Sequence, residues 1–175
     1  FKKQDQLDAL MEKLNPLADE LKKRGVRVQV DASDKATPGF KFAEYELKGV
    51  PLRLAMGGRD LENGTIELAR RDTMSKETVS FDGIVETIEN LLKEIQANIY
   101  QKALDFRLAN TREVDTWEDF KEEIKKPGFL LCHWDGKAET KATIRCIPLE
   151  GDKTPGKCIY TGKPSSQRVI FAIAY

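Results

Sequence analysis

The stretch from residue 38 to residue 71 constrains the fold most, because turn-forming residues divide it into short elements of different type. It opens with a Pro-Gly pair, which ends whatever element precedes it. From Phe40 to Lys48, apolar side chains recur at spacings of three and four residues. This period predicts a short helix. Gly49 follows at the position where a helix end favours a residue that tolerates positive φ.

Two strands are predicted in the rest of this stretch, at Leu52–Met56 and Thr65–Ala69, with a turn at Gly57-Gly58 between them. Cationic side chains recur near the ends of these elements: Lys41, Arg53, Arg59, Arg70 and Arg71. Cations beside Gly-rich backbone suit phosphate groups and base edges. The same pattern is also typical of an ordinary solvated α/β surface, so the pattern alone leaves both interpretations open.

An amphipathic helix is predicted before this stretch, over residues 4–24. Pro16 interrupts the pattern, and a kink or a restart of the helix is expected there. Val26–Val30 alternates apolar and polar residues and predicts a strand. A helix followed by a strand, repeated along the chain, indicates an α/β sheet with parallel neighbours, in which ligands lie at the carboxyl ends of strands.

The division into domains rests on one long predicted helix, from Gly83 to about Arg112, which follows a short strand at Glu77–Ser80. Because such a helix is long for one small domain, we expect it to end the first domain and enter the second. The expected domains are residues 1–104 and 105–175.

The second domain is predicted to be small and of the α+β class. A helix at Trp117–Lys125 is expected to be capped by Thr116, with Asp119 three residues after the cap. Strands are predicted over residues 129–133, 142–148 and 167–174.

Composition excludes some classes of protein. The formal net charge is zero, which argues against a polybasic nucleic-acid binder but permits a local basic face. No run of about 18 apolar residues occurs, so no membrane span is expected. The three cysteines have no pairing by spacing, which suits free thiols in a reducing cytoplasm.

No catalytic residue can be assigned. His133 is the only histidine, and its neighbour Cys132 would point to the opposite face of a strand. Both are interpreted as structural residues. Phosphate-binding glycine loops and the zinc-protease motif are absent from the sequence.

The segments PGFKFAEYELKGVPLR, GGRDLEN and ARRD resemble the anticodon-binding domain of prolyl-tRNA synthetases of the eukaryote-like and archaeal-like form, which some bacteria also have. GVRVQVD and the closing FAIAY fit the same family, whereas ELKGVPLR is shared more loosely with the threonyl, histidyl and glycyl enzymes. The resemblance implies a mixed-sheet class II synthetase anticodon-binding domain followed by a small α+β domain. The family usually has proline where Gly58 stands.

The resemblance also implies a function. The family attaches proline to its tRNA in an ATP-dependent reaction, in a catalytic domain that we expect outside this chain together with ATP and Mg. The implied partners are the anticodon loop of proline tRNA, the protein's own catalytic domain and a second copy in a homodimer. The implied RNA contacts are Lys41, Glu46, Arg53, Arg59 and Arg70. Glu46 could accept hydrogen bonds from a guanine edge, and Phe40, Phe42 and Tyr45 could stack on bases.

Two further implications concern the second domain. Many relatives bind zinc there, and the matching positions in this chain are Asp135, Thr140, Cys158 and Thr161. Zinc needs about four strong donors. Because only one of these four positions carries a thiol, we expect the metal to be lost. Tyr175 is expected to support the active site of the catalytic domain through its terminal carboxylate.

Other interpretations remain open. The chain could be a stand-alone RNA-binding paralogue or part of another class II synthetase. It could also be a structural or dimerisation module that binds no RNA.

Overall fold

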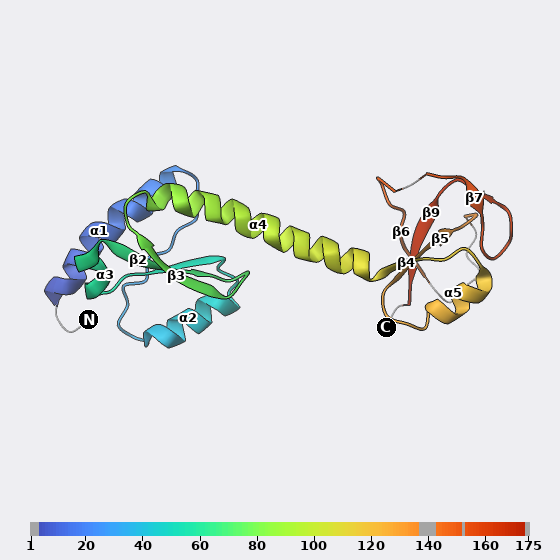
Figure 1. Ribbon diagram of the computed structural model, residues 1–175. Helices are drawn as coiled ribbons and strands as arrows, with labels where there is room; N and C mark the ends of the chain where they lie inside the picture. The colour runs from blue at the N-terminus through green and yellow to red at the C-terminus, as the bar shows by residue number, and fades with distance from the viewer. Residues whose placement is uncertain (1–3, 137–142, 152, 174–175) are drawn as a thin grey trace. The chain divides into compact units, whose positions relative to one another are not determined.

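The computed structural model describes residues 4–136, 143–151 and 153–173. The chain divides into two compact units, Phe1–Gln101 and Lys102–Tyr175 (Figure 1). The elements of the first unit are α1 (Gln4–Lys23), α2 (Pro38–Leu47), β1 (Leu52–Ala55), α3 (Gly58–Asn63), β2 (Thr65–Arg70), β3 (Ser75–Ser80) and the larger part of α4 (Ile84–Ala109).

The first sheet has the strand order β1-β2-β3 and is antiparallel throughout. The prediction of parallel neighbours is therefore wrong for this unit. Residues 56–64 connect β1 to β2, and residues 71–74 connect β2 to β3. Parallel pairing needs a crossover of about a dozen residues or more, and both connections are shorter.

The core of the first unit lies on one face of this sheet. Leu17 and Leu21 of α1 and Ile88 of α4 are buried together with Ile66 and Leu68 of β2. Alternate residues of each strand point to the other face, and that face is covered by α2 (Figure 1). One face of the sheet therefore packs on the core, and the other faces α2.

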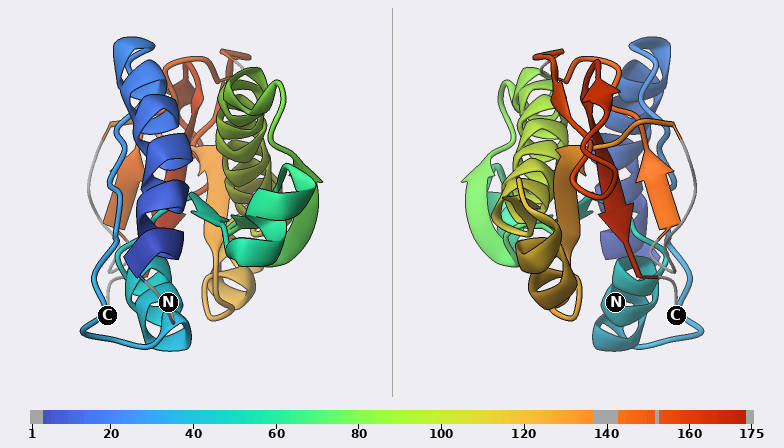
Figure 2. Two further views of the ribbon diagram at one scale, coloured as in Figure 1. Left: turned by 90° about the vertical axis from the view of Figure 1, so that its left-hand side faces the viewer. Right: turned by 90° about the vertical axis from the view of Figure 1, so that its right-hand side faces the viewer.

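Helix α1 agrees with its predicted extent and runs through Pro16 without a restart (Figure 2). Helix α2 begins with Pro38, and the Thr37 side chain accepts a hydrogen bond from the Phe40 backbone N–H. Gly49 follows α2 with φ of 79°, as its position predicted.

Two predicted elements differ from the structure. Val26–Val30 is not a strand, although Val26 and Val28 pack on the core as the alternation indicated. Within the described residues no neighbouring strand pairs with this segment, and without a ladder partner an extended segment is not a strand. Gly57-Gly58 is not a simple turn, because Gly57 caps α3 and its N–H donates to Asp60 Oδ2 at 2.8 Å.

The second unit contains β4 (Thr111–Glu113), α5 (Trp117–Glu123), β5 (Phe129–His133), β6 (Thr143–Cys146), β7 (Gly156–Lys157), β8 (Pro164–Ser165) and β9 (Arg168–Ala172). The order β4-β5-β9-β6 forms a mixed sheet, in which β4 and β5 are parallel and the other pairs are antiparallel. The chain is thus a mixed α/β protein with a mixed sheet, as predicted. The long helix ends three residues earlier than predicted, because Thr111 and Arg112 pair with β5.

The core of the second unit joins α5 to this sheet. Phe120 of α5 meets Phe171 of β9 edge to face, with ring centroids 5.5 Å apart. Thr116 caps α5 by accepting from the Asp119 N–H at 3.1 Å, as predicted. Cys132 and His133 are both buried, and the three cysteines are free. No helix in the described part of the chain is long and apolar enough to span a membrane.

Candidate nucleic-acid interface

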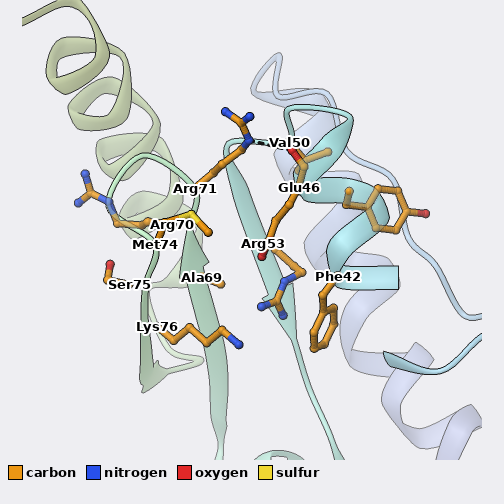
Figure 3. Close-up of a pocket in the computed structure, with 11 residues that line it drawn as sticks. Phe42, Glu46, Val50, Arg53, Ala69, Arg70, Arg71, Met74, Ser75 and Lys76 are labelled. Atoms are coloured by element: carbon orange, nitrogen blue, oxygen red, sulfur yellow. Dashed lines mark hydrogen bonds between the residues drawn. The ribbon is translucent and has the colours of Figure 1, made fainter. Parts of the chain in front are cut away.

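A shallow cavity of about 60 Å³ lies between α2 and the sheet (Figure 3). The strand register aligns Arg53 of β1 with Ala69 of β2, and Ala69 with Lys76 of β3. Residues paired in this way project to the same face of a sheet. The small Ala69 side chain is therefore flanked by two cations, and this row forms the floor of the cavity.

The Arg53 guanidinium is stacked on an aromatic ring. Its Cζ lies 3.5 Å from the centroid of the Phe42 ring, and its Nη1 donates to Glu67 Oε1 at 3.3 Å. Its Nε and Nη2 atoms are shielded from solvent and have no hydrogen-bond partner among the described residues. These two nitrogens form one edge of the guanidinium, which is a fork suited to two acceptor atoms in one plane.

The rim of the cavity combines cations with one carboxylate. The Arg71 side chain donates from Nε to the Glu46 backbone carbonyl at 2.9 Å, which ties the turn after β2 to α2. The Glu46 side chain lines the cavity, and within the described residues its carboxylate makes no hydrogen bond or ion pair. Lys76 Nζ lies 5.9 Å from the Phe42 ring centroid. The site therefore offers hydrogen-bond donors, one acceptor and an aromatic surface.

Lys41 lies on α2 but does not line this cavity. Its Nζ donates to Asp31 Oδ1 at 2.8 Å and to the Ser33 carbonyl. Tyr45 donates its hydroxyl to the other Asp31 oxygen at 3.1 Å. The hydrogen bond from Lys41 is the main cause that lowers the pKa of Asp31, whereas burial and the neighbouring Asp31 raise the pKa of Tyr45. Lys41 therefore joins the loop before α2 to that helix.

Arg70 directs its guanidinium toward α4. It contacts both oxygens of Asp72, at 3.0 and 3.2 Å, and Glu94 at 3.1 Å. Asn98 of α4 also donates to Asp72, at 2.6 Å. The hydrogen bonds from Arg70 outweigh the effect of burial and lower the pKa of Asp72 to about 2. Arg70 therefore holds the turn after β2 against α4.

Arg59 lies away from the cavity. It is in α3, which follows the carboxyl end of β1, whereas the cavity lies at the other end of that strand. Its side chain is exposed and makes no ion pair within the described residues. Of the five predicted RNA contacts, the structure thus brings Arg53 and Glu46 together in the cavity, and it separates Lys41 and Arg59 from them. The fifth, Arg70, also lines the cavity, but its guanidinium is paired with Asp72 and Glu94.

Sequence reasoning missed several residues of the cavity, among them Lys76 and Met74. Lys76 lies just before the strand predicted at Glu77–Ser80, and only the pairing of β2 with β3 places it beside Ala69. A hairpin prediction that extended both strands to Arg70 and Ser75 would have found it. Met74 carried no signal, because its place depends on the conformation of the turn.

The positions expected for zinc do not fit that metal. Thr161 Oγ1 donates to Asp135 Oδ2 at 2.6 Å, so these two side chains bind each other. Cys158 supplies one thiol, and Thr140 lies outside the described residues. No group of three or more histidine, cysteine or acidic side chains close enough to hold a metal occurs in the described part of the chain.

The surroundings of Cys158 have opposing effects on the pKa of its thiol. Burial raises the pKa of this thiol, but the Thr161 side chain and backbone N–H groups at Thr161, Tyr160 and Asp135 outweigh that effect and lower it. The Cys132 thiol is different, because burial raises its pKa to about 12.

Comparison with known families gives two matches. Residues 2–91 match the family model described as the anticodon binding domain, which is more than half of the chain. The chain belongs to the anticodon-binding domain family. Residues 117–175 match the family described as the C-terminal domain of prolyl-tRNA synthetase. The cavity described above lies wholly within the anticodon-binding domain.

Relatives of this anticodon-binding domain protein include bacterial proteins named proline–tRNA ligase. The chain is 59% identical to the one from Porphyromonas gingivalis, 58% to the one from Parabacteroides distasonis and 56% to the one from Cytophaga hutchinsonii. Each alignment covers the whole of this chain. The chain spans only 37–38% of the length of these relatives.

Proposed function

We propose that the cavity between α2 and the sheet binds a base in the anticodon loop of proline tRNA. The observation that carries this proposal is the Arg53 edge, whose Nε and Nη2 atoms are buried and have no hydrogen-bond partner in the described part of the chain. Buried donors without partners are costly, and a ligand with two acceptor atoms would remove that cost. The O6 and N7 atoms of guanine are such a pair.

The other groups of the cavity suit an unpaired base. RNA is recognised mainly where bases in loops are unstacked and their edges exposed. Glu46 would accept hydrogen bonds from amino or imino groups of the base, while Arg71 and Lys76 would contact the flanking phosphates. Since both nitrogens are shielded from solvent, the groups that cover them must move aside when the base enters.

The remaining predicted contacts have different parts in this proposal. Arg59 is exposed and without an ion pair within the described residues, so it would bind a phosphate outside the cavity. Lys41 and Arg70 are engaged by Asp31 and Asp72. Direct contacts from them to RNA would require these ion pairs to open.

A binding measurement with the proline anticodon stem-loop tests the proposal. Arg53→Ala should weaken binding by about 1–3 kcal/mol. Arg53→Lys keeps the charge but loses the fork, so it should weaken binding nearly as much. Ala69→Leu should also weaken binding, because a larger side chain fills the floor of the cavity. Arg107→Ala removes an exposed arginine from the second unit and serves as the control.

The result that contradicts the proposal is equally specific. If folded Arg53→Ala protein binds the stem-loop as tightly as the parent, the cavity does not bind the base. If Arg107→Ala weakens binding as much as Arg53→Ala, the loss of affinity reflects the total charge of the protein and not the cavity.

We further propose that the whole protein attaches proline to its tRNA, in a catalytic domain outside this chain that binds ATP and Mg. The names of the bacterial relatives support this proposal. The match over residues 117–175 supports a prolyl-tRNA synthetase. The resemblance of the segments quoted above is the ground for proposing the eukaryote-like and archaeal-like form, which some bacteria also have. In the same proposal the enzyme is a cytoplasmic homodimer without zinc, and Tyr175, outside the described residues, supports its active site. Proline-dependent exchange of pyrophosphate into ATP by the full-length protein is the test.

A further inference from the structure

Met74 is in an unusual backbone conformation. Its φ is 56°, and it is the one residue other than glycine with positive φ within the described residues. The left-handed region is unfavourable for side chains that carry a Cβ atom, and glycine or asparagine is the usual choice there. An outlier of this kind is a reason to look for a function at that position.

The Met74 side chain is also exposed, although it is large and apolar. It is 68% exposed and lines the cavity (Figure 3). In Figure 3, Met74 lies on the side of the β2–β3 turn and Phe42 on the side of α2, with Arg53 between them. A ligand whose edge meets Arg53 would therefore have Met74 beside it.

The turn that carries Met74 is held from several directions, so its conformation is not that of a loose loop. Arg71 binds the Glu46 carbonyl of α2 at 2.9 Å. The Asp72 side chain is fully buried and receives hydrogen bonds from Arg70 and from Asn98 of α4. The hydroxyls of Thr73 and Ser75 lie 2.7 Å apart on either side of Met74. Strained residues persist where the surrounding contacts determine the backbone in this way.

We propose that Met74 is a binding residue of this site, whose thioether packs against the flat face of the base that enters the cavity. This inference rests on the proposed function. The methionine sulfur is polarisable and makes favourable contacts with aromatic rings. An exposed thioether held in a fixed turn beside an arginine fork therefore suits a nucleobase, because one group contacts its edge and the other its face.

Three variants separate the contact from the strain. Met74→Ala removes the contact and keeps a Cβ atom, and Met74→Gly removes both the contact and the strain. Met74→Leu keeps an apolar side chain of similar size. Both truncations should weaken binding of the proline anticodon stem-loop by about threefold to tenfold, as expected for a sulfur–aromatic contact. Met74→Leu should bind much closer to the parent than either truncation does.

Stability provides the second measurement. Because glycine tolerates positive φ and alanine does not, the first unit of Met74→Gly should be more stable than that of Met74→Ala, with equal RNA affinity. Circular dichroism at 222 nm and peptide-resolved hydrogen exchange over residues 65–80 measure this difference. A merely structural role for Met74 would instead make RNA affinity follow stability across the three variants, which would overturn the inference.

The Arg53→Ala variant distinguishes failure of the inference about Met74 from failure of the proposed function. If Arg53→Ala weakens binding while Met74→Ala and Met74→Gly bind like the parent, the inference about Met74 is wrong and the proposed function stands. If Arg53→Ala also binds like the parent, the proposed function fails, and the inference fails with it.

Discussion

Replacing Asp72 with asparagine should destabilise the first unit in a way that depends on pH. The Asp72 carboxylate is fully buried, receives two hydrogen bonds from Arg70 and one from Asn98, and has its pKa lowered from 3.8 to about 2. A shift of this size corresponds to about 2 kcal/mol, because one pKa unit is about 1.4 kcal/mol. Asp72→Asn should therefore lower the free energy of unfolding by about that amount at pH 7.

The pH dependence has a definite direction. Since the folded state lowers the pKa of Asp72, it favours the ionised carboxylate, and the stabilisation is complete above the unfolded pKa near 4. It is lost as the pH falls from about 4 toward 2. The parent and Asp72→Asn should therefore differ most above pH 5 and converge near pH 2.

The assay must report on the correct unit. Trp117 and Trp134 both lie in the second unit, so tryptophan fluorescence does not follow Asp72. Urea unfolding followed by circular dichroism, combined with hydrogen exchange of the β2 and β3 amides, does follow it. Glu94→Gln is the matched control, because it removes the other acidic partner of Arg70. Glu94 is 61% exposed, so its loss should cost less than about 1 kcal/mol.

Two results would refute this reasoning. One is a difference between the parent and Asp72→Asn that stays the same from pH 7 to pH 2. The other is a loss of stability in Asp72→Asn no larger than that in Glu94→Gln.

Four further predictions concern other parts of the chain. Arg59→Ala should weaken stem-loop binding by about 1–3 kcal/mol if Arg59 reads a base and by less if it binds only a phosphate, and unchanged affinity would exclude both. Purified protein should contain no stoichiometric zinc, which elemental analysis checks; about one zinc per chain, released only by unfolding or strong chelation, would contradict it. Deletion of Tyr175 from the full-length enzyme should lower proline activation without changing stem-loop affinity, and lost RNA binding with intact activation would show the opposite role. Gly156→Ala should destabilise the second unit, because the added Cβ would clash with the His133 ring; tryptophan fluorescence during urea unfolding measures this, and an unchanged midpoint would show that β7 can move away from His133 without cost.

Sequence reasoning succeeded where local signals decide the structure. The extent of α1, the presence of a short helix before Gly49, the positive φ of Gly49 and the Thr116 cap all follow from residue types within one or two helical turns. It failed at Val26–Val30, where the alternation was correct but strand formation depends on a partner that alternation cannot supply. The prediction of parallel neighbours was wrong because it rested on the alternation of helices and strands. It took no account of the connections between the strands that pair, which are too short for a crossover.

The candidate site was predictable only in part, because contacts between residues that are distant in the sequence also determine it. Motif resemblance indicated Arg53 and Glu46, and the structure places both in one cavity. Lys41 has an equally suitable charge, but its ion pair with Asp31 joins residues ten positions apart, and nothing in the local sequence indicates that pairing. Lys76 reaches the cavity only through strand register, and Met74 only through the conformation of a turn.

The row formed by Arg53, Ala69 and Lys76 has a consequence for how such a domain can diversify. Core residues and cavity residues alternate along the same strands, with Leu52, Leu54 and Leu68 on the core face and this row on the other. Substitutions in the row alter the shape and charge offered to a ligand and leave the apolar packing intact. A shift of one residue in pairing would exchange the two faces entirely. New ligand preferences are therefore accessible by single substitutions, whereas insertions within these strands would abolish folding and recognition together.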